Sequence, residues 1–364
     1  MAGLPRLAES NRPDPSSRIK RVTEYAQLCR TLMNRAATLL LLVSTTSFVW
    51  GQSISAGQED SSATIVSTST LVVVPATVRD ASGEPFTKLQ ARDFRLTDNG
   101  VEQKAVAESV PGEPVALVVI VQTGGSAPVQ FQNYRTLNAI VSSLTEHNAH
   151  RVGLVTFDSR LEEIWSFPPR VDGLKDAFRN PEKGDHGAAI LDAVNCGIGL
   201  LDHQPASFRR VILLLSQAAD DVSKTAPAEV LRRLGESNTT IYSIVFPPEK
   251  PAKHSSARDR NRRRSAPGPD LSLDAVLAAM QTKTAATVAT VSGGESVGLK
   301  SKDDLDRTLS ILANDFANSY TLSFRPASAE PGLHWIGIQL AKEHSHATIE
   351  ARRLYWNGQD GSTE

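Results

Sequence analysis

Four apolar runs in the middle of the chain constrain its fold more than any other feature. They are nearly continuous in Val, Ile and Leu, and they span residues 115–121, 152–157, 210–216 and 240–246. The segments between them have the spacing of amphipathic helices, near residues 130–147, 187–202 and 226–236. Strands buried on both faces and separated by helices are typical of a parallel sheet with helical layers on each side. The sequence therefore predicts an open, doubly wound α/β domain over residues 112–316, with further helices near 271–282 and 303–317.

β-type segments flank this domain on both sides. The N-terminal ones include DFRLTDNGVEQKAVAESV, which has an Asp-Asn-Gly turn between two strand patterns, and they predict a β-unit over residues 65–111. Three segments with alternating apolar and polar residues follow the α/β region, at 319–326, 333–341 and 347–356. We expect the C-terminal strands, within 317–356, to join the N-terminal unit in one β-rich domain, with 357–364 as a tail.

The first 51 residues have the layout of a secretory signal peptide. A basic stretch leads into an apolar run that begins at Ala36, and small residues follow it up to Gly51. A spanning helix needs roughly 20 apolar residues, and the polar residues 44–47 interrupt the run, which favours cleavage over a signal anchor. Met33 offers an alternative start that would exclude residues 1–32. We therefore expect a secreted or periplasmic protein with a polar lead-in over 52–64 and no spanning segment after cleavage.

Charge and cysteine content narrow the function further. The 364 residues have a formal net charge of -1, so nothing global points to nucleic acid or to an anionic membrane. The segment 247–270 is rich in Arg, Lys and Pro and predicts a disordered basic insertion; docking to an anionic surface is its alternative role. Cys196 is the single cysteine after the predicted cleavage point, which excludes an intramolecular disulfide and favours a buried apolar role.

The order of motifs along the α/β region resembles a von Willebrand factor type A (VWA) domain. The motifs are VALVVIVQTGGSA, VGLVTFDSRLEEI, HGAAILDAV, RRVILLLSQAADD and TTIYSIVF. With the flanking β-segments, the chain is similar over residues 65–356 to the secreted VWA-related group that is abundant in acidobacteria. The resemblance implies a Rossmann-like sheet and a Mg²⁺-type ion at the C-terminal ends of its strands. It also implies the ligands of that ion: an Asp-x-Ser-x-Ser loop, a Thr and a later Asp, completed by a carboxylate of a partner protein.

Carried over position by position, this ligand pattern is almost entirely lost. The two Asp positions carry amides, two hydroxyl positions carry no oxygen, and one Ser matches; in chain order the residues are Gln122, Gly124, Ser126, Ala188 and Gln217. Affinity in oxygen sites depends on the number of ligand charges, so the resemblance implies a degenerate metal site with no metal and no other cofactor. The alternative is an altered Mg²⁺ or Ca²⁺ site in which nearby acids compensate, namely Asp158, Asp185, Asp220 and Asp221.

Other expectations concern the same loops. Gly124 and Gly125 allow a tight turn, Ser126 is expected to cap the following helix, and Asp192 is expected to be structural. No nucleophile elbow, phosphate-binding loop or His cluster stands out; a hydrolase that uses Ser126 is a further alternative. The sequence thus predicts a non-enzymatic, adhesion-type interaction module that binds an unknown protein partner, but not nucleic acid, at the rim of the sheet near Gln122–Ser126.

Overall fold

The computed structural model describes most of the chain beyond residue 70. The described residues are 71–86, 88–109, 113–134, 137, 151–168, 178, 181–247, 272–299, 305–306, 309–310, 315, 318–328, 330–344 and 346–358. The predicted signal peptide, lead-in, basic insertion and nearly all of the tail lie outside these residues, so they stay predictions. Within the described residues, no helix combines the length and the apolar character needed to cross a membrane.

A six-stranded sheet forms the centre of the α/β domain. Its strands are β5 (Val115–Gln122), β6 (Arg151–Phe157), β7 (Leu161–Trp165), β8 (Arg209–Ser216), β9 (Thr239–Val245) and β10 (Ser296–Gly298). They lie in the order β10-β9-β8-β5-β6-β7, and β7 alone among them runs antiparallel to its neighbour. Every side chain of β5 is buried, as its continuous apolar run predicts. The predicted mostly parallel sheet is confirmed.

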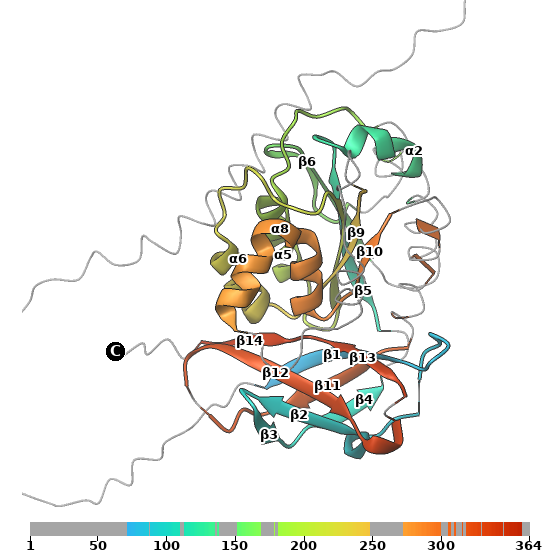
Figure 1. The fold of residues 1–364 in the computed structure, drawn as a ribbon, viewed down its shortest axis with the longest axis vertical. Coiled ribbons are helices and arrows are strands. Elements are labelled where there is room, and N and C mark those ends of the chain that lie inside the picture. The colour runs from blue at the N-terminus through green and yellow to red at the C-terminus, as the bar shows by residue number, and fades with distance from the viewer. Residues whose placement is uncertain are drawn as a thin grey trace, which may run out of the picture. The chain divides into compact units, whose positions relative to one another are not determined.

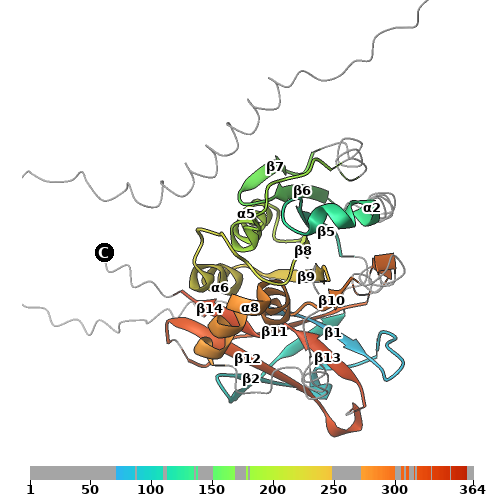
Figure 2. The same cartoon turned by 45° about the horizontal axis from the view of Figure 1, so that its top comes forward.

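Helices cover both faces of this sheet. They are α2 (Phe131–Tyr134), which follows the turn η2 (Ala127–Gln130), then α5 (Ile190–Asp202), α6 (Pro227–Glu236) and α8 (Leu273–Ser292). Figures 1 and 2 show α2 on one side of the sheet and α5, α6 and α8 on the other. Val119 and Val121 of β5 pack in a cluster with Tyr134, whereas Ile120 faces Gly197 of α5. Alternate residues of one strand therefore serve two helical layers, and the domain is doubly wound.

Two antiparallel sheets form the β-rich domain from both ends of the described chain. One has the order β13-β1-β11-β4 and the other β14-β12-β2-β3. The strands are β1 (Val72–Arg79), β2 (Phe94–Asp98), β3 (Val101–Gln103), β4 (Val106–Ser109), β11 (Tyr320–Phe324), β12 (Gly332–Leu340), β13 (Thr348–Ala351) and β14 (Leu354–Asn357), with short 3-10 turns η1 (Ala91–Asp93) and η3 (Lys342–His344). Blue β1 lies beside red β11 and β13 in Figure 1. The expected joining of N- and C-terminal segments is confirmed.

A buried polar network links the N-terminal strand β2 to the C-terminal strands β12 and β14 of the β-rich domain. Nδ1 of His334 lies 2.9 Å from a carboxylate oxygen of Asp98, and the hydroxyl of Tyr355 donates to the other oxygen at 2.8 Å. Nε2 of His334 lies 2.8 Å from the carbonyl oxygen of Glu330. Asp98, His334 and Tyr355 are all buried. Each polar atom that folding removes from water here has a partner, which buried groups require.

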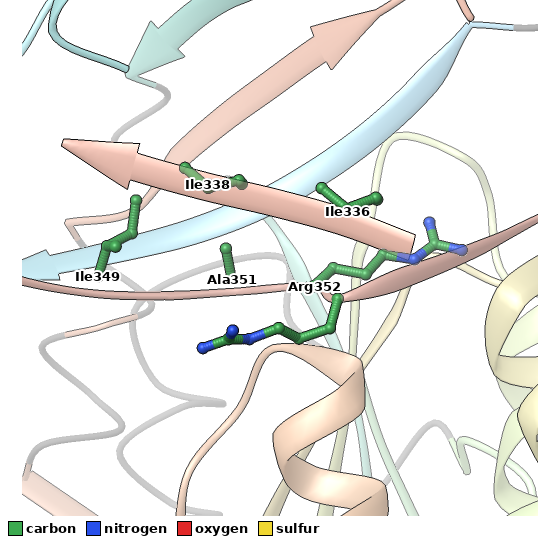
Figure 3. Close-up of a pocket in the computed structure, with 6 residues that line it drawn as sticks. Ile336, Ile338, Ile349, Ala351 and Arg352 are labelled. Carbon is green, nitrogen blue, oxygen red and sulfur yellow. The ribbon is translucent and has the colours of Figure 1, made fainter. Parts of the chain in front are cut away.

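The C-terminal strands are also fixed to the α/β domain, through Arg352. This buried guanidinium donates to the side-chain oxygen of Asn238 and to four main-chain carbonyls. The carbonyls are those of Val73, Leu234, Gly235 and Leu354. Leu234 and Gly235 lie at the C-terminal end of α6, where the helix dipole favours a cation. Burial lowers the pKa of Arg352 to about 10. Figure 3 shows Arg352 beside a small hollow lined by Ile336, Ile338, Ile349, Ala351 and Arg353.

Two expectations about individual elements are wrong, and one strand was not expected. The helix expected near 271–282 continues to Ser292, because small and apolar residues keep packing on β9 past a kink at Lys283. The strand expected over 347–356 is broken at Arg352, where the chain leaves one sheet of the β-rich domain and enters the other. Strand β7 was not expected at all; its sequence LEEIW carries two adjacent acids, and its residues are only half-buried at the edge of the sheet.

Candidate functional site

The carboxyl ends of β5 and β8 bring Gln122 and Gln217 together. Gln122 is the last residue of β5, and Gln217 directly follows β8. The two strands are neighbours, but the chain leaves β5 toward β6 on its other side, so the strand order reverses between them. Ligands of doubly wound sheets bind in the crevice at such a point. Both amides therefore occupy the position that the topology favours for a site.

The two amides are hydrogen bonded to each other. Nε2 of Gln122 donates to Oε1 of Gln217 at 3.2 Å, and the main-chain NH of Gln217 donates to Oε1 of Gln122 at 2.8 Å. Nε2 of Gln122 also donates to the carbonyl of Gly124, and Nε2 of Gln217 donates to that of Ala219, both at 2.9 Å. Gln122 is fully buried. The arrangement links the ends of both strands through neutral groups alone.

The turn after β5 requires glycine at two positions. A Cβ atom on Gly124 would lie 2.6 Å from the carbonyl oxygen of Gly187 and 2.7 Å from that of Asp185. Gly125 has a φ of +54°, and a Cβ there would lie 2.9 Å from Oε1 of Gln217. The first value is a close approach of backbone to backbone, which only glycine permits. The loop at Gly124 consequently has no room for the hydroxyl side chain that the VWA pattern has there.

Ser126 does not cap the following helix, contrary to expectation. It stands at the N-cap position of η2, but its side chain makes no capping hydrogen bond. The segment after it is a 3-10 turn with Pro128 near its start, and Pro has no NH to offer. Among the described residues, no His or acid forms a hydrogen bond with Ser126. The turn is held instead by main-chain bonds, such as that from the NH of Gly125 to the carbonyl of Asp185 at 2.8 Å.

Asp158 and Asp185 join the neighbouring loops to one another. The carboxylate of Asp158 accepts hydrogen bonds from the main-chain NH groups of Arg160 and Asp185, each at 3.0 Å. That of Asp185 accepts from the main chain of Ser159 and Gly187 and from the hydroxyl of Ser159. The Ser159 hydroxyl, first among these donors, lowers the pKa of Asp185. These carboxylates stabilise the loops that surround the amide pair.

Asp220 and Asp221 instead occupy the N-terminal end of α5. Asp221 accepts a hydrogen bond from the NH of Ala188 at 2.7 Å, and Asp220 accepts one from the NH of Leu191 at 2.8 Å. Negative groups at this end of a helix bind its free NH groups and offset its dipole. Ala188 is fully buried. Asp192, on the first turn of α5, in turn accepts bonds from the main chain of the 223–225 loop, which agrees with its expected structural role.

Glu162 is a residue at this edge that sequence reasoning missed. It lies on β7, and Oε2 lies 2.6 Å from the hydroxyl of Thr123, which also bonds to the carbonyl of Phe157 at 2.9 Å. Burial, followed among the raising effects by the charge of Asp158, raises the pKa of Glu162 to about 7. The hairpin that folds β7 back onto β6 is what brings this carboxyl beside the loop. Nothing in the local sequence signals that contact.

Comparisons with known proteins concern the fold. No family model and no curated protein matches the chain. Solved structures similar to it include an aerotolerance-related membrane protein from Bacteroides fragilis, with 11% identity over 55% of this chain and 99% of that one and a TM-score of 0.37. The SpRpn10 VWA domain has 10% identity over 53% and 95% and a TM-score of 0.34. The pilus adhesin SpaC from Lactobacillus rhamnosus GG has 11% identity over 79% and 44% and a TM-score of 0.37. Likenesses of this degree carry no argument about function.

The architecture itself matches what the sequence resemblance implied. Five parallel strands, one antiparallel edge strand, helices on both faces and a reversal of strand order at β5 and β8 are all present. The α/β domain has a VWA-like fold. The five positions at which the resemblance implied metal ligands lie on three loops at one edge of the sheet of this VWA-like domain.

The donor set at this edge does not fit a hard divalent cation. Mg²⁺ and Ca²⁺ prefer oxygen ligands that include carboxylates, whereas the centre of the VWA-like edge holds two amides that bond to each other. The four nearby acids bond to main-chain NH groups of the loops and of α5. Across the described ranges, no group of three or more His, Cys, Asp or Glu side chains is placed to hold a metal ion.

Proposed function

We propose that the protein is an exported, non-enzymatic interaction module whose VWA-like domain binds a protein partner without a divalent metal ion. The observation that carries the proposal is the reciprocal hydrogen bonding of Gln122 and Gln217. An ion would bridge the ends of β5 and β8 through negative ligands; here two neutral amides already make that bridge. The loops after β5 and β8 are thus linked by hydrogen bonds, and binding of a partner at the rim does not require an ion to link them.

The surfaces of the VWA-like domain support a partner at the rim. The opposite end of the domain, where α6 ends, already contacts β14 and Arg352 of the β-rich domain. At the rim, the loop that follows β8 leaves Val222 and Asp221 exposed, and the loop before α5 leaves His186 exposed. Val129, in the turn after the Gln122–Ser126 loop, is 67% exposed. Exposed apolar side chains among polar ones are a common composition for a protein-binding surface.

Calorimetry with the protein that begins at Gln52 tests the absence of an ion requirement. We expect no heat of binding when Mg²⁺ or Ca²⁺ is titrated to millimolar concentration, because the amide pair supplies no charge. Binding of either ion in the micromolar range would contradict the proposal and support the alternative, a metal-dependent adhesion domain with an altered site. A protein with a known Ca²⁺ site, titrated under the same conditions, is the positive control for the measurement.

Capture of a partner tests the interaction itself. The wild-type protein and a rim variant, Val129→Asp with Val222→Asp, are immobilised and exposed to an envelope extract with and without a chelator. We expect a protein that the wild type retains in both conditions and that the rim variant loses. Retention that disappears with the chelator would contradict metal independence. Equal retention by wild type and rim variant would contradict the rim as the binding surface.

A further inference from the structure

A single guanidinium is surrounded by three carboxyl groups where the two domains meet. Arg79, the last residue of β1, lies 2.5 Å from a carboxylate oxygen of Asp315 and 3.1 Å from one of Glu295. Glu350 of β13 is the third acid, at 3.6 Å. Arg79 and Glu350 belong to the β-rich domain, and Glu295 and Asp315 belong to the VWA-like domain. We call Arg79, Glu295, Asp315 and Glu350 the seam cluster.

The acids of the seam cluster compete for the same partner, and they differ in exposure: the side chains of Glu295 and Glu350 are 33% and 34% exposed. The side chain of Arg79 is 13% exposed, and that of Asp315 is 1% exposed. One oxygen of Asp315 is buried and has no hydrogen-bond partner within the described part of the chain. A buried carboxylate oxygen without a donor is unfavourable. The cluster therefore holds more acceptor atoms than the guanidinium of Arg79 can satisfy.

Protonation of one acid would relieve this competition, and Glu350 is the group for which it is easiest. Burial and then the charge of Glu295 raise the pKa of Glu350 to about 7, and Asp315 acts in the same direction. Two guanidiniums, those of Arg79 and Arg353, oppose the shift but do not cancel it. Burial also raises the pKa of Asp315, against the effect of Arg79 and Arg209. Glu350 thus changes its charge in a pH range where ordinary glutamates stay ionised.

We propose that the seam cluster is a proton-controlled latch, which holds the β-rich domain firmly against the VWA-like domain when Glu350 is neutral and loosens when Glu350 is ionised. Neutral Glu350 leaves Arg79 to the two carboxylates of the VWA-like domain. Ionised Glu350 adds a negative charge that faces Glu295 and Asp315 across the seam. Glu350 also directly precedes the Ala351–Arg352 corner, so that a displacement of β13 would reach the hydrogen bonds of Arg352 to α6.

Hydrogen exchange at the seam, measured from pH 5 to pH 9 and corrected with unfolded peptides, tests the latch. The amides followed are those of Glu295–Gly298 and Thr348–Ala351. In the wild type we expect the opening equilibrium to increase by about tenfold or more over this range, because each unit of pKa shift is a tenfold difference in proton affinity. In Glu350→Gln, which cannot ionise, the same amides should keep one opening equilibrium at every pH.

Two further variants serve as a control and as an independent test. Glu108→Gln removes an exposed acid from β4 of the same sheet and should keep the wild-type pH profile. Glu295→Gln removes the neighbour with the largest charge effect on Glu350, so the midpoint of opening should move to lower pH. A flat profile in the wild type, an unchanged profile in Glu350→Gln, or an unmoved midpoint in Glu295→Gln would each overturn the proposal. If Glu350→Gln does not fold, the shift in Glu295→Gln decides the question.

Discussion

Gln122 and Gln217 are each both donor and acceptor to the other. The side-chain NH₂ of Gln122 bonds to the side-chain oxygen of Gln217, and the main-chain NH of Gln217 bonds to the side-chain oxygen of Gln122. Such a ring links two parallel strands at the end where the sheet is open. The ring joins the two strand ends through neutral groups alone, so truncation of either amide measures what it contributes to stability.

Truncation of either amide should destabilise the domain. We expect Gln217→Ala to lower the free energy of unfolding by about 1–3 kcal/mol, because it removes the acceptor of one Nε2 hydrogen of buried Gln122. Urea denaturation of Gln217→Ala, Gln122→Ala and the double variant measures the coupling. The double variant should lose less than the sum of the single losses, since the interaction can be removed only once. Strictly additive losses would show that the pair is not coupled.

Gly124 should not tolerate serine, although the VWA pattern has a serine there. We expect Gly124→Ser to lower the free energy of unfolding by more than about 1 kcal/mol, because its Cβ would lie 2.6 Å from a carbonyl oxygen of the adjacent loop. Gly298→Ser is the matched control, because a Cβ on Gly298 would have no atom within 4 Å. Thermal unfolding of both variants provides the comparison. A Gly124→Ser variant as stable as its control would mean that the loops can separate easily.

Glu162 should make part of the stability of the protein pH-dependent. Its pKa is raised to about 7 in the folded protein from an ordinary value of 4.5. The folded state therefore binds the proton more tightly than the unfolded state, and stability from this group declines as pH rises from about 4.5 to about 7. We expect Glu162→Gln to gain stability relative to the wild type over that interval and to keep a constant advantage above it. Chemical denaturation at several pH values measures the difference, with Glu163→Gln as the control; parallel profiles would refute the expectation.

Gly293 should be among the least replaceable residues of the chain. It ends α8 with a φ of +88°, and a Cβ on it would lie 2.2 Å from the main-chain nitrogen of Arg352. Gly293→Ala combines an unfavourable backbone conformation with a clash against the β13–β14 corner. We expect a loss of more than about 1 kcal/mol in urea denaturation, whereas Gly298→Ala should change little. Wild-type stability of Gly293→Ala would indicate that the corner can move away from α8.

The central strands of the sheet could be predicted because a strand that is buried on both faces is apolar at nearly every position. In β5 all side chains are buried, and the sequence has no polar residue until Gln122. Strand β7 could not be predicted in this way, since its residues are only half-buried at the edge of the sheet and its sequence LEEIW includes two acids. The end of α8 was missed for a related reason: its small residues pack closely on β9, but they show little amphipathic contrast along the sequence.

The candidate site could likewise be predicted only in part from the sequence. That Gln122 and Gln217 share one edge follows from the rule that parallel strands end together, and it could be inferred from sequence. That they hydrogen bond to each other, and that Asp220 and Asp221 turn to the N-terminal end of α5, depends on loop conformations that no periodicity encodes. Glu162 depends on the β6–β7 hairpin, and so it could be found only in three dimensions.

The way the β-rich domain is assembled sets an order for folding during synthesis. Strands β1 and β4 pair with β11, which begins at Tyr320, whereas they end at Arg79 and Ser109, so the ribosome releases them long before their partner exists. The VWA-like domain has all six of its strands by Gly298 and can fold in the meantime. Until β11 to β14 emerge, the early strands expose unpaired edges. A nascent chain stalled before Tyr320 should therefore need a chaperone for its first strands, even while its central sheet is already protected.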